Sequence, residues 1–176
     1  MTETTPELRV QFSKRNDGSV VLQFFRGDDS TTWRRYEKQA VFFSFHDLTH
    51  FAVETTLGFK AGFYGLIASG WDIPDTEGKG PRGKPPAEAV IVEHVVGLFT
   101  GERAGGAAPL STTEFNAHLQ QMAAGNDIRV DRTFTDGEFI TVRKRINELH
   151  SQWAAVPAGS VLELIFNRGG AHGNAG

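Results

Sequence analysis

The sequence predicts an α+β fold in which an antiparallel sheet packs against four to five helices. Strand-like patterns lie near the two ends of the chain, within residues 8–37 and 160–167, and helical patterns fill the region between them. Strands and helices that are segregated along a chain are typical of α+β proteins. The 176 residues match the size of one domain and show no internal repeat, so we expect a single domain over residues 1–176.

Three N-terminal strands are expected to form a meander. Every second residue from 8 to 12 is apolar, which is the pattern of a strand with one buried face. The dipeptide Asp17-Gly18 indicates a hairpin turn before a second strand over 20–26, and residues 31–37 are rich in residue types that favour strands. We expect the C-terminal strand to pair with this meander and complete the sheet.

The middle of the chain carries helical patterns and capping signals. Ser44 is a candidate N-cap for a helix that ends near Gly58, and two later helices begin with a Ser/Thr-x-x-Glu capping box. The third helix is apolar nearly all round, which indicates that it is buried. Residues 72–86 form a long loop, and residues 1–7 and 168–176 are expected to be flexible. The expected helices cover residues 44–57, 59–71, 87–99, 111–124 and 135–156.

The composition excludes several classes of site. The chain contains no cysteine, which rules out disulfides, thiolate catalysis and cysteine-type zinc sites, so a metal ion would need His, Asp or Glu ligands. A net charge of −3 gives no overall attraction to nucleic acid or to anionic membranes. The sequence shows no signal-peptide pattern and no apolar run long enough to cross a bilayer. We expect a cytoplasmic protein with neither membrane nor nucleic-acid partners.

Titratable side chains are concentrated on one predicted helix. His46 and His50 are four residues apart, so they lie one turn apart on the same helical face. At roughly 100° per residue, Asp47 and Glu54 fall within about 100° of His46 on the same side. Two imidazoles in this arrangement can bind one divalent metal ion. Zinc is the usual occupant of such sites, and nickel, iron and manganese are compatible with the same ligands.

A third protein ligand has to come from another segment. Glu93 and His94 interrupt an otherwise apolar helix, and buried polar groups need partners, so we take them as the strongest candidates. His150 and His118 are further possibilities that the sequence does not rank. The predicted metal ligands are therefore His46, His50, Glu93 and His94.

Asp47 and Glu54 are the candidate catalytic carboxylates. Glu54 lies about 12 Å along the helix axis from His46, too far to share one ion with both histidines. It is better placed to accept a hydrogen bond from His50, or a proton from a metal-bound water. Asp47 has an alternative structural role, because an acidic residue in the first helical turn stabilises a helix.

The string HDLTH at residues 46–50 resembles the H-E-x-x-H motif of the zincin metallopeptidases, with Asp47 in place of the glutamate. The resemblance covers five residues. It implies that His46 and His50 are metal ligands and that Asp47 polarises a metal-bound water. Asp is one methylene shorter than Glu, which changes its reach toward that water. The resemblance also implies a downstream ligand, which this chain would have to supply from Glu93 or His94.

We therefore expect a metal-binding protein, and specifically a metal-dependent hydrolase whose 72–86 loop covers the cleft. The substrate, a small molecule or a peptide, is not indicated by any residue pattern. An alternative is a metal-free protein–protein interaction or regulatory module, in which a helix seam or a sheet edge forms a homodimer. A nucleic-acid-binding module that uses Trp33, Arg34 and Arg35 is the weakest alternative, because the basic residues are scattered.

Overall fold

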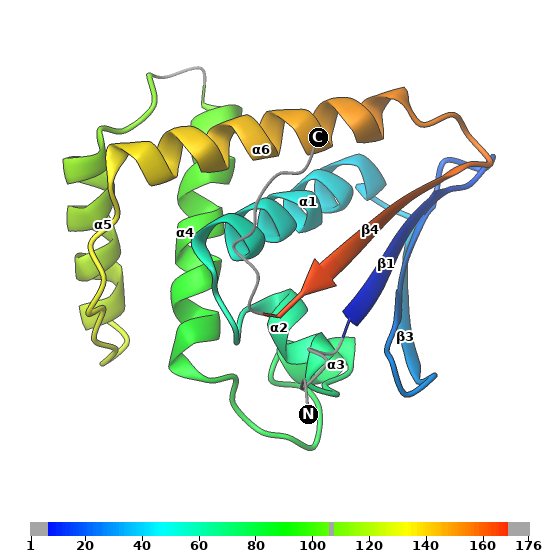
Figure 1. The fold of residues 1–176 in the computed structure, drawn as a ribbon, viewed down its shortest axis with the longest axis horizontal. Helices are drawn as coiled ribbons and strands as arrows, with labels where there is room; N and C mark the ends of the chain where they lie inside the picture. The colour runs from blue at the N-terminus through cyan, green and yellow to red at the C-terminus, as the bar shows by residue number, and fades with distance from the viewer. Residues whose placement is uncertain (1–6, 106–107, 169–176) are drawn as a thin grey trace, which may run out of the picture.

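The structure is a computed structural model, and it describes residues 7–105 and 108–168. In this part of the chain, four strands form one antiparallel sheet with the order β3-β2-β1-β4 (Figure 1). The α+β class and the pairing of the C-terminal strand with the N-terminal meander are therefore confirmed. The strands are β1 (Glu7–Lys14), β2 (Val20–Phe25), β3 (Thr31–Tyr36) and β4 (Val161–Asn167).

One face of the sheet is covered by helices. Val10 and Phe12 of β1 are fully buried and alternate with more exposed residues. The register places Val10 opposite Phe24 in β2 and opposite Leu164 in β4. Because side chains that pair across strands point to the same face, these residues form one apolar surface on which the helices pack.

Six helices occur in the described residues, one more than the upper limit of the prediction. The additional helix, α3, is a single turn inside the expected 72–86 loop. Figure 1 shows α1 and α6 side by side above the sheet, with α4 against α1 and α5 against α4. The helices are α1 (Ala40–Leu57), α2 (Phe63–Ala68), α3 (Ile73–Thr76), α4 (Ala87–Ala104), α5 (Thr112–Ala124) and α6 (Asp136–Ala155).

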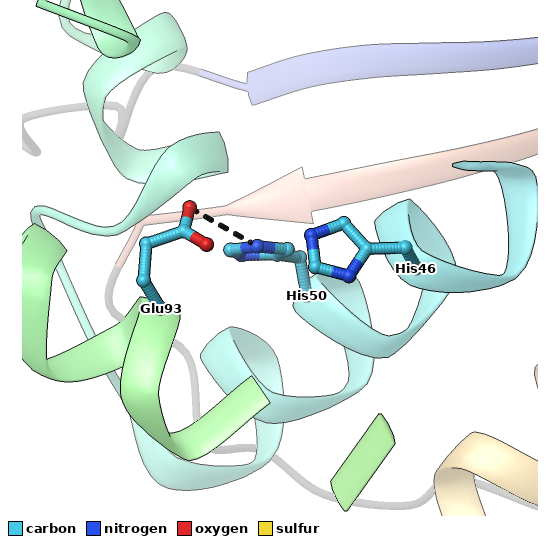
Figure 2. A group of neighbouring side chains, drawn as sticks. All are labelled: His46, His50 and Glu93. Carbon is cyan, nitrogen blue, oxygen red and sulfur yellow. Dashed lines mark ion pairs between the residues drawn. The ribbon is translucent and has the colours of Figure 1, made fainter. Parts of the chain in front are cut away.

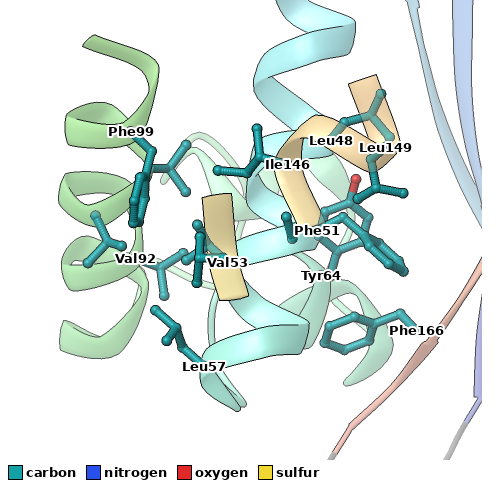
Figure 3. Close-up of a cluster of buried hydrophobic side chains, with 14 of the residues drawn as sticks. Leu48, Phe51, Val53, Leu57, Tyr64, Val92, Phe99, Ile146, Leu149 and Phe166 are labelled. Atoms are coloured by element: carbon teal, nitrogen blue, oxygen red, sulfur yellow. The ribbon is translucent and has the colours of Figure 1, made fainter. Parts of the chain in front are cut away.

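The main core lies where α1 meets the sheet, α4 and α6 (Figure 3). Phe51 of α1 packs edge-on against Tyr64 of α2, and Tyr64 in turn stacks on Phe166 of β4. Aromatic rings of this size each bury a large apolar area, so these contacts fix α1 relative to the sheet. None of the helices among the described residues combines the length and the apolar character needed to cross a membrane.

Helix α1 begins earlier than the predicted N-cap, Ser44. The N-cap is Gln39, with φ 53°, and Ser44 lies inside the helix, where its hydroxyl donates to the carbonyl of Ala40 at 2.6 Å. A serine hydroxyl can satisfy a carbonyl one turn earlier as well as cap a helix, so the prediction of the cap was wrong. Asp47 consequently lies beyond the first turn and loses its expected capping role. The helix does end at Gly58, with φ 71°, as predicted.

Helix α4 is buried on one face only, so the expectation of a helix buried all round is wrong. Glu93 and Gly97 are exposed, and Val90, Ile91 and Leu98 are only partly buried. The sequence predicts burial all round because α4 also carries apolar residues outside the buried face. The residues that α4 buries are Ala89, Val92, Val95, Val96 and Phe99.

Candidate metal site

Three of the predicted ligands converge between two helices. His46 and His50 project from consecutive turns of α1, and Glu93 reaches toward them from α4 (Figure 2). One donor atom from each residue lies within 4.8 Å of the other two. Among the described residues, this group of two imidazoles and one carboxylate could hold a metal ion.

The separations are close to those of a bound ion. Ligands of a tetrahedral zinc ion, at bond lengths of about 2.0–2.1 Å, lie about 3.4 Å from one another. Nε2 of His50 and Oε1 of Glu93 are 3.2 Å apart, which is already within that spacing. No two donor atoms of the group are more than 4.8 Å apart, so side-chain rotation could bring the third donor to the spacing of a bound ion.

A buried carboxylate orients the central imidazole. Oε1 of Glu54 lies 3.3 Å from Nδ1 of His50, and the Glu54 side chain is fully buried. The same carboxylate accepts the backbone N–H groups of Tyr64 at 3.0 Å and Gly65 at 3.2 Å, at the start of α2. Amides at a helix N-terminus have no partner within the helix and favour a negative charge. These bonds hold Glu54 in place, and Nε2 of His50 is left facing Glu93. A histidine that binds a metal through one ring nitrogen typically hydrogen-bonds a carboxylate through the other.

Gly62 makes room for this carboxylate. A Cβ atom at position 62 would lie 2.5–2.8 Å from the Glu54 carboxylate atoms, which is closer than real Cβ atoms come to their neighbours. The local sequence does not show that the group admitted by Gly62 is the Glu54 side chain. No local pattern links two residues whose contact depends on how α1 and α2 are joined.

The two imidazoles have opposite charge preferences. Burial by itself would lower the pKa of His50, but hydrogen bonds with Glu54 and Glu93 outweigh it and raise that pKa to about 10. Burial, together with the charge on His50, lowers the pKa of His46 to about 4. Without a metal ion, His50 is therefore an imidazolium held between two carboxylates, and His46 is a neutral imidazole at neutral pH.

His46 has a nitrogen with no protein partner. Its ring stacks on Phe42 with 6.1 Å between centroids and lies 4.9 Å from the His50 ring. In the part of the chain that the structure describes, Nδ1 of His46 is buried without a hydrogen-bond partner. Figure 2 shows the ring turned toward His50 and Glu93. A buried nitrogen of this kind is costly unless something else binds it. The nitrogen that lies nearer to His50 and Glu93 in Figure 2 is the other one, Nε2.

Asp47 lies beside the group but is engaged elsewhere. Its Oδ2 accepts the phenolic hydrogen of Tyr36 at 2.7 Å, and its backbone carbonyl accepts that of Tyr64 at 2.9 Å. Burial raises the pKa of the Asp47 carboxyl to about 6, although the hydrogen bond from Tyr36 opposes the rise. The contact with Tyr36 could not be predicted from the sequence, because β3 and α1 meet only in the folded chain.

The other three histidines lie outside the group. His94 follows Glu93 on α4 but faces Asn126, with 3.5 Å between their side-chain nitrogens. His118 is exposed on α5. His150 of α6 contacts Arg103 and the carbonyl of Phe45. Neighbouring positions on a helix differ by about 100° in direction, and here Glu93 faces His50 of α1 whereas His94 faces Asn126.

Comparison with protein-family models, with curated proteins and with solved structures finds no match for this chain. Function is therefore inferred from the geometry and chemistry of the site alone.

Proposed function

We propose that the protein binds one divalent metal ion through His46, His50 and Glu93, and that this ion is zinc. The observation that supports this most strongly is the convergence of three donor atoms within 4.8 Å of one another. The central imidazole is also oriented by a buried carboxylate, Glu54. Imidazole nitrogens and carboxylate oxygens suit zinc, whereas nickel, iron and manganese accept the same donors less commonly in such sites.

We further propose that the site is hydrolytic. Two histidines and one glutamate leave one position of a tetrahedral ion open, which is the arrangement of catalytic zinc sites. The side chain of Glu93 is 57% exposed, so this member of the group is in contact with solvent. A divalent ion held by these three residues would lower the pKa of a bound water toward neutrality. In hydrolysis the water oxygen bonds to the electrophilic atom, the leaving-group bond breaks, one water proton stays on the new hydroxyl and the other passes to the leaving group.

The two candidate catalytic carboxylates have different parts in this proposal. Glu54 is held by His50 and by two backbone amides, so we assign it the positioning of His50. Asp47 directly follows His46 in the chain, and a carboxyl pKa of about 6 suits a group that exchanges protons near neutral pH. We therefore assign Asp47 the role of accepting a proton from the attacking water.

A zinc titration of chelator-treated protein, followed by calorimetry and elemental analysis, tests metal binding. We expect one zinc ion per chain. Loss of a residue that only hydrogen-bonds to a metal ligand weakens metal binding by roughly 10- to 100-fold. We expect at least this loss of zinc affinity in each of the three ligand variants, His46→Ala, His50→Ala and Glu93→Gln. His94→Ala is the matched control and should bind zinc like the wild type. Equal effects in all four variants, or none in any, would refute the site.

Hydrolysis is tested separately. The zinc-loaded and chelator-treated proteins are compared on chromogenic carboxylic esters and phosphate diesters. Turnover that needs zinc and is lost in His50→Ala supports the hydrolase. Stoichiometric zinc binding with no turnover on any of these substrates would restrict the function to metal binding.

A further inference from the structure

A cavity of about 220 Å³ adjoins the metal site and shares one wall with it. It lies between α1, α4 and α6, and His46 is both a member of the metal-binding group and part of the cavity lining. Four large apolar side chains supply much of the remaining surface: Phe42, Phe45, Phe99 and Ile146. Apolar cavities of about 150 Å³ accept a molecule the size of benzene, so this one has room for a single ring or a short chain with a polar substituent.

The cavity contains a cation, Arg103, that has no acidic partner among the described residues. Arg103 lines it and contacts only neutral groups among the described residues, the imidazole of His150 and the ring of Phe45, 4.7 Å from its guanidinium carbon. The neighbouring carboxylate of Glu102 pairs instead with Arg143 at 2.7 Å. A guanidinium carries five N–H donors, so Arg103 retains donors for a bound anion.

Hydrogen bonding fixes His150 as a neutral acceptor for Arg103. The arginine can only donate, so Nδ1 of His150 accepts from it and the ring proton resides on Nε2. Nε2 lies 3.1 Å from the carbonyl of Phe45, which accepts that proton. His150 thus holds the guanidinium in place without neutralising its charge.

Two buried polar atoms also belong to residues of this cavity. Nδ1 of His46 and Oγ1 of Thr100 are the buried side-chain atoms without a hydrogen-bond partner in the described residues, and both residues line the cavity. Buried polar atoms are nearly always paired, so two unpaired atoms around one cavity point to a missing binding partner. The polar atoms and Arg103 together indicate a ligand that is not purely apolar.

We propose that this cavity binds small molecules with an apolar body and a carboxylate, and that these are the substrates of the metal site. The part of the proposal that concerns substrates rests on the hydrolase function proposed above. The apolar body would lie among the phenylalanines, and the carboxylate would pair with Arg103. Arg103 is ten residues beyond Glu93 on α4, about 15 Å along the axis, so the anionic end would lie away from the ion and the body would extend toward His46.

The test measures binding to chelator-treated protein, so that carboxylates cannot bind through a metal ion. The probes are phenylacetate and hexanoate, each compared with its neutral amide, and binding is followed by chemical-shift titration. We expect each carboxylate to bind at least about tenfold more tightly than its amide. Arg103→Gln should remove this preference, and Ala104→Trp, which fills the cavity, should abolish binding of all four probes. Arg145→Gln is the control and should bind like the wild type, because Arg145 pairs with Glu148 and does not line the cavity.

The outcomes separate this proposal from the metal site. Equal binding of carboxylate and amide by the wild-type protein, or no binding of any probe, would overturn the cavity proposal even if zinc binds normally. Because this comparison uses the wild type, it does not depend on whether a variant folds. Preferential carboxylate binding in a protein that takes up no zinc would retain the anion-binding cavity and refute the metal-dependent function instead.

Discussion

Glu54 and His50 are one helical turn apart on α1, and Oε1 of the glutamate lies 3.3 Å from Nδ1 of the histidine. Glu54 also accepts two amide hydrogens from the start of α2, so the carboxylate joins two helices at the point where the imidazole is held. The orientation of His50 toward Glu93 therefore depends on the packing of α2 against α1, and changes to this contact should alter metal binding without removing a ligand.

Replacing Glu54 tests this dependence. Glu54→Gln keeps the size of the side chain but removes the charge that orients His50, so we expect zinc affinity to fall by about 10- to 100-fold. Calorimetric zinc titration measures the change. Glu148→Gln, at an exposed position on α6, is the control and should leave the affinity unchanged. Unchanged zinc binding in Glu54→Gln would show that the carboxylate serves the fold and not the metal site.

Substitution at Gly62 tests the space around the same carboxylate. The added methyl group of Gly62→Ala would overlap the Glu54 carboxylate, so we expect the free energy of unfolding to fall by about 1–3 kcal/mol. Gly97→Ala, on the exposed side of α4, has open space around its Cβ and should be stabilised by about 0.5–1 kcal/mol because alanine favours helix. Chemical denaturation measures both. Equal effects of the two substitutions would contradict the close approach of Glu54 to Gly62.

Zinc binding should displace a proton from His50. The raised pKa of about 10 keeps this ring protonated at pH 7.5 without metal, and a metal ion binds only the neutral ring nitrogen. We expect release of about one proton per zinc ion at pH 7.5. The proton count comes from calorimetry in buffers that differ in ionisation enthalpy. Zinc binding without proton release would contradict the imidazolium between Glu54 and Glu93.

The metal-free protein should lose stability on both sides of neutral pH. The folded pKa of His50 lies above its ordinary value of 6.5, so its contribution is complete below pH 6.5 and is lost as the pH rises toward about 10. The folded pKa values of His46 and His150 lie near 4, so their contributions are complete above pH 6.5 and are lost as the pH falls toward 4. Thermal unfolding from pH 4 to 10 measures this profile. A stability that rises steadily from pH 7 to 10 would contradict the assignment of His50.

Asp47→Asn should separate catalysis from metal binding. Asp47 contributes no atom to the three-residue group, so we expect zinc affinity to change by less than about threefold. If Asp47 is the proton acceptor, zinc-dependent turnover should fall by about 10²- to 10⁴-fold in the same variant. Tyr36→Phe provides the comparison, because it keeps the Asp47 carboxylate but removes the hydrogen bond that this carboxylate accepts from Tyr36. A large loss of zinc affinity in Asp47→Asn would instead make Asp47 part of the metal-binding group.

Much of the fold follows from local patterns in the sequence. Alternating apolar residues identified β1, and a turn signal and strand-favouring residue types identified β2 and β3. The capping boxes at Ser111 and Thr135 identified the starts of α5 and α6, both of which the structure shows. The start of α1 was misplaced because the hydroxyl of Ser44 bonds within the helix. A local pattern shows which hydrogen bonds a side chain can make, and the contacts in the folded chain determine which of them it makes.

The site could be predicted only where its geometry is local. The four-residue spacing of His46 and His50 places both rings on one face of α1 whatever surrounds them. The choice between Glu93 and His94 depends on how α4 is rotated against α1, and no spacing along the chain determines that rotation. For the same reason, neither the contact between Gly62 and Glu54 nor the cavity containing Arg103 could be predicted from the sequence.

The most direct measurement is the X-ray absorption spectrum of zinc in the zinc-loaded wild-type protein. We predict a four-coordinate ion at nitrogen and oxygen distances of about 2.0–2.1 Å, with the multiple-scattering pattern of two imidazoles. His50→Ala should lose one of these imidazoles, and His94→Ala should give the wild-type spectrum. A spectrum without imidazole scattering, or one changed by His94→Ala but not by His50→Ala, would contradict a metal site at His46, His50 and Glu93.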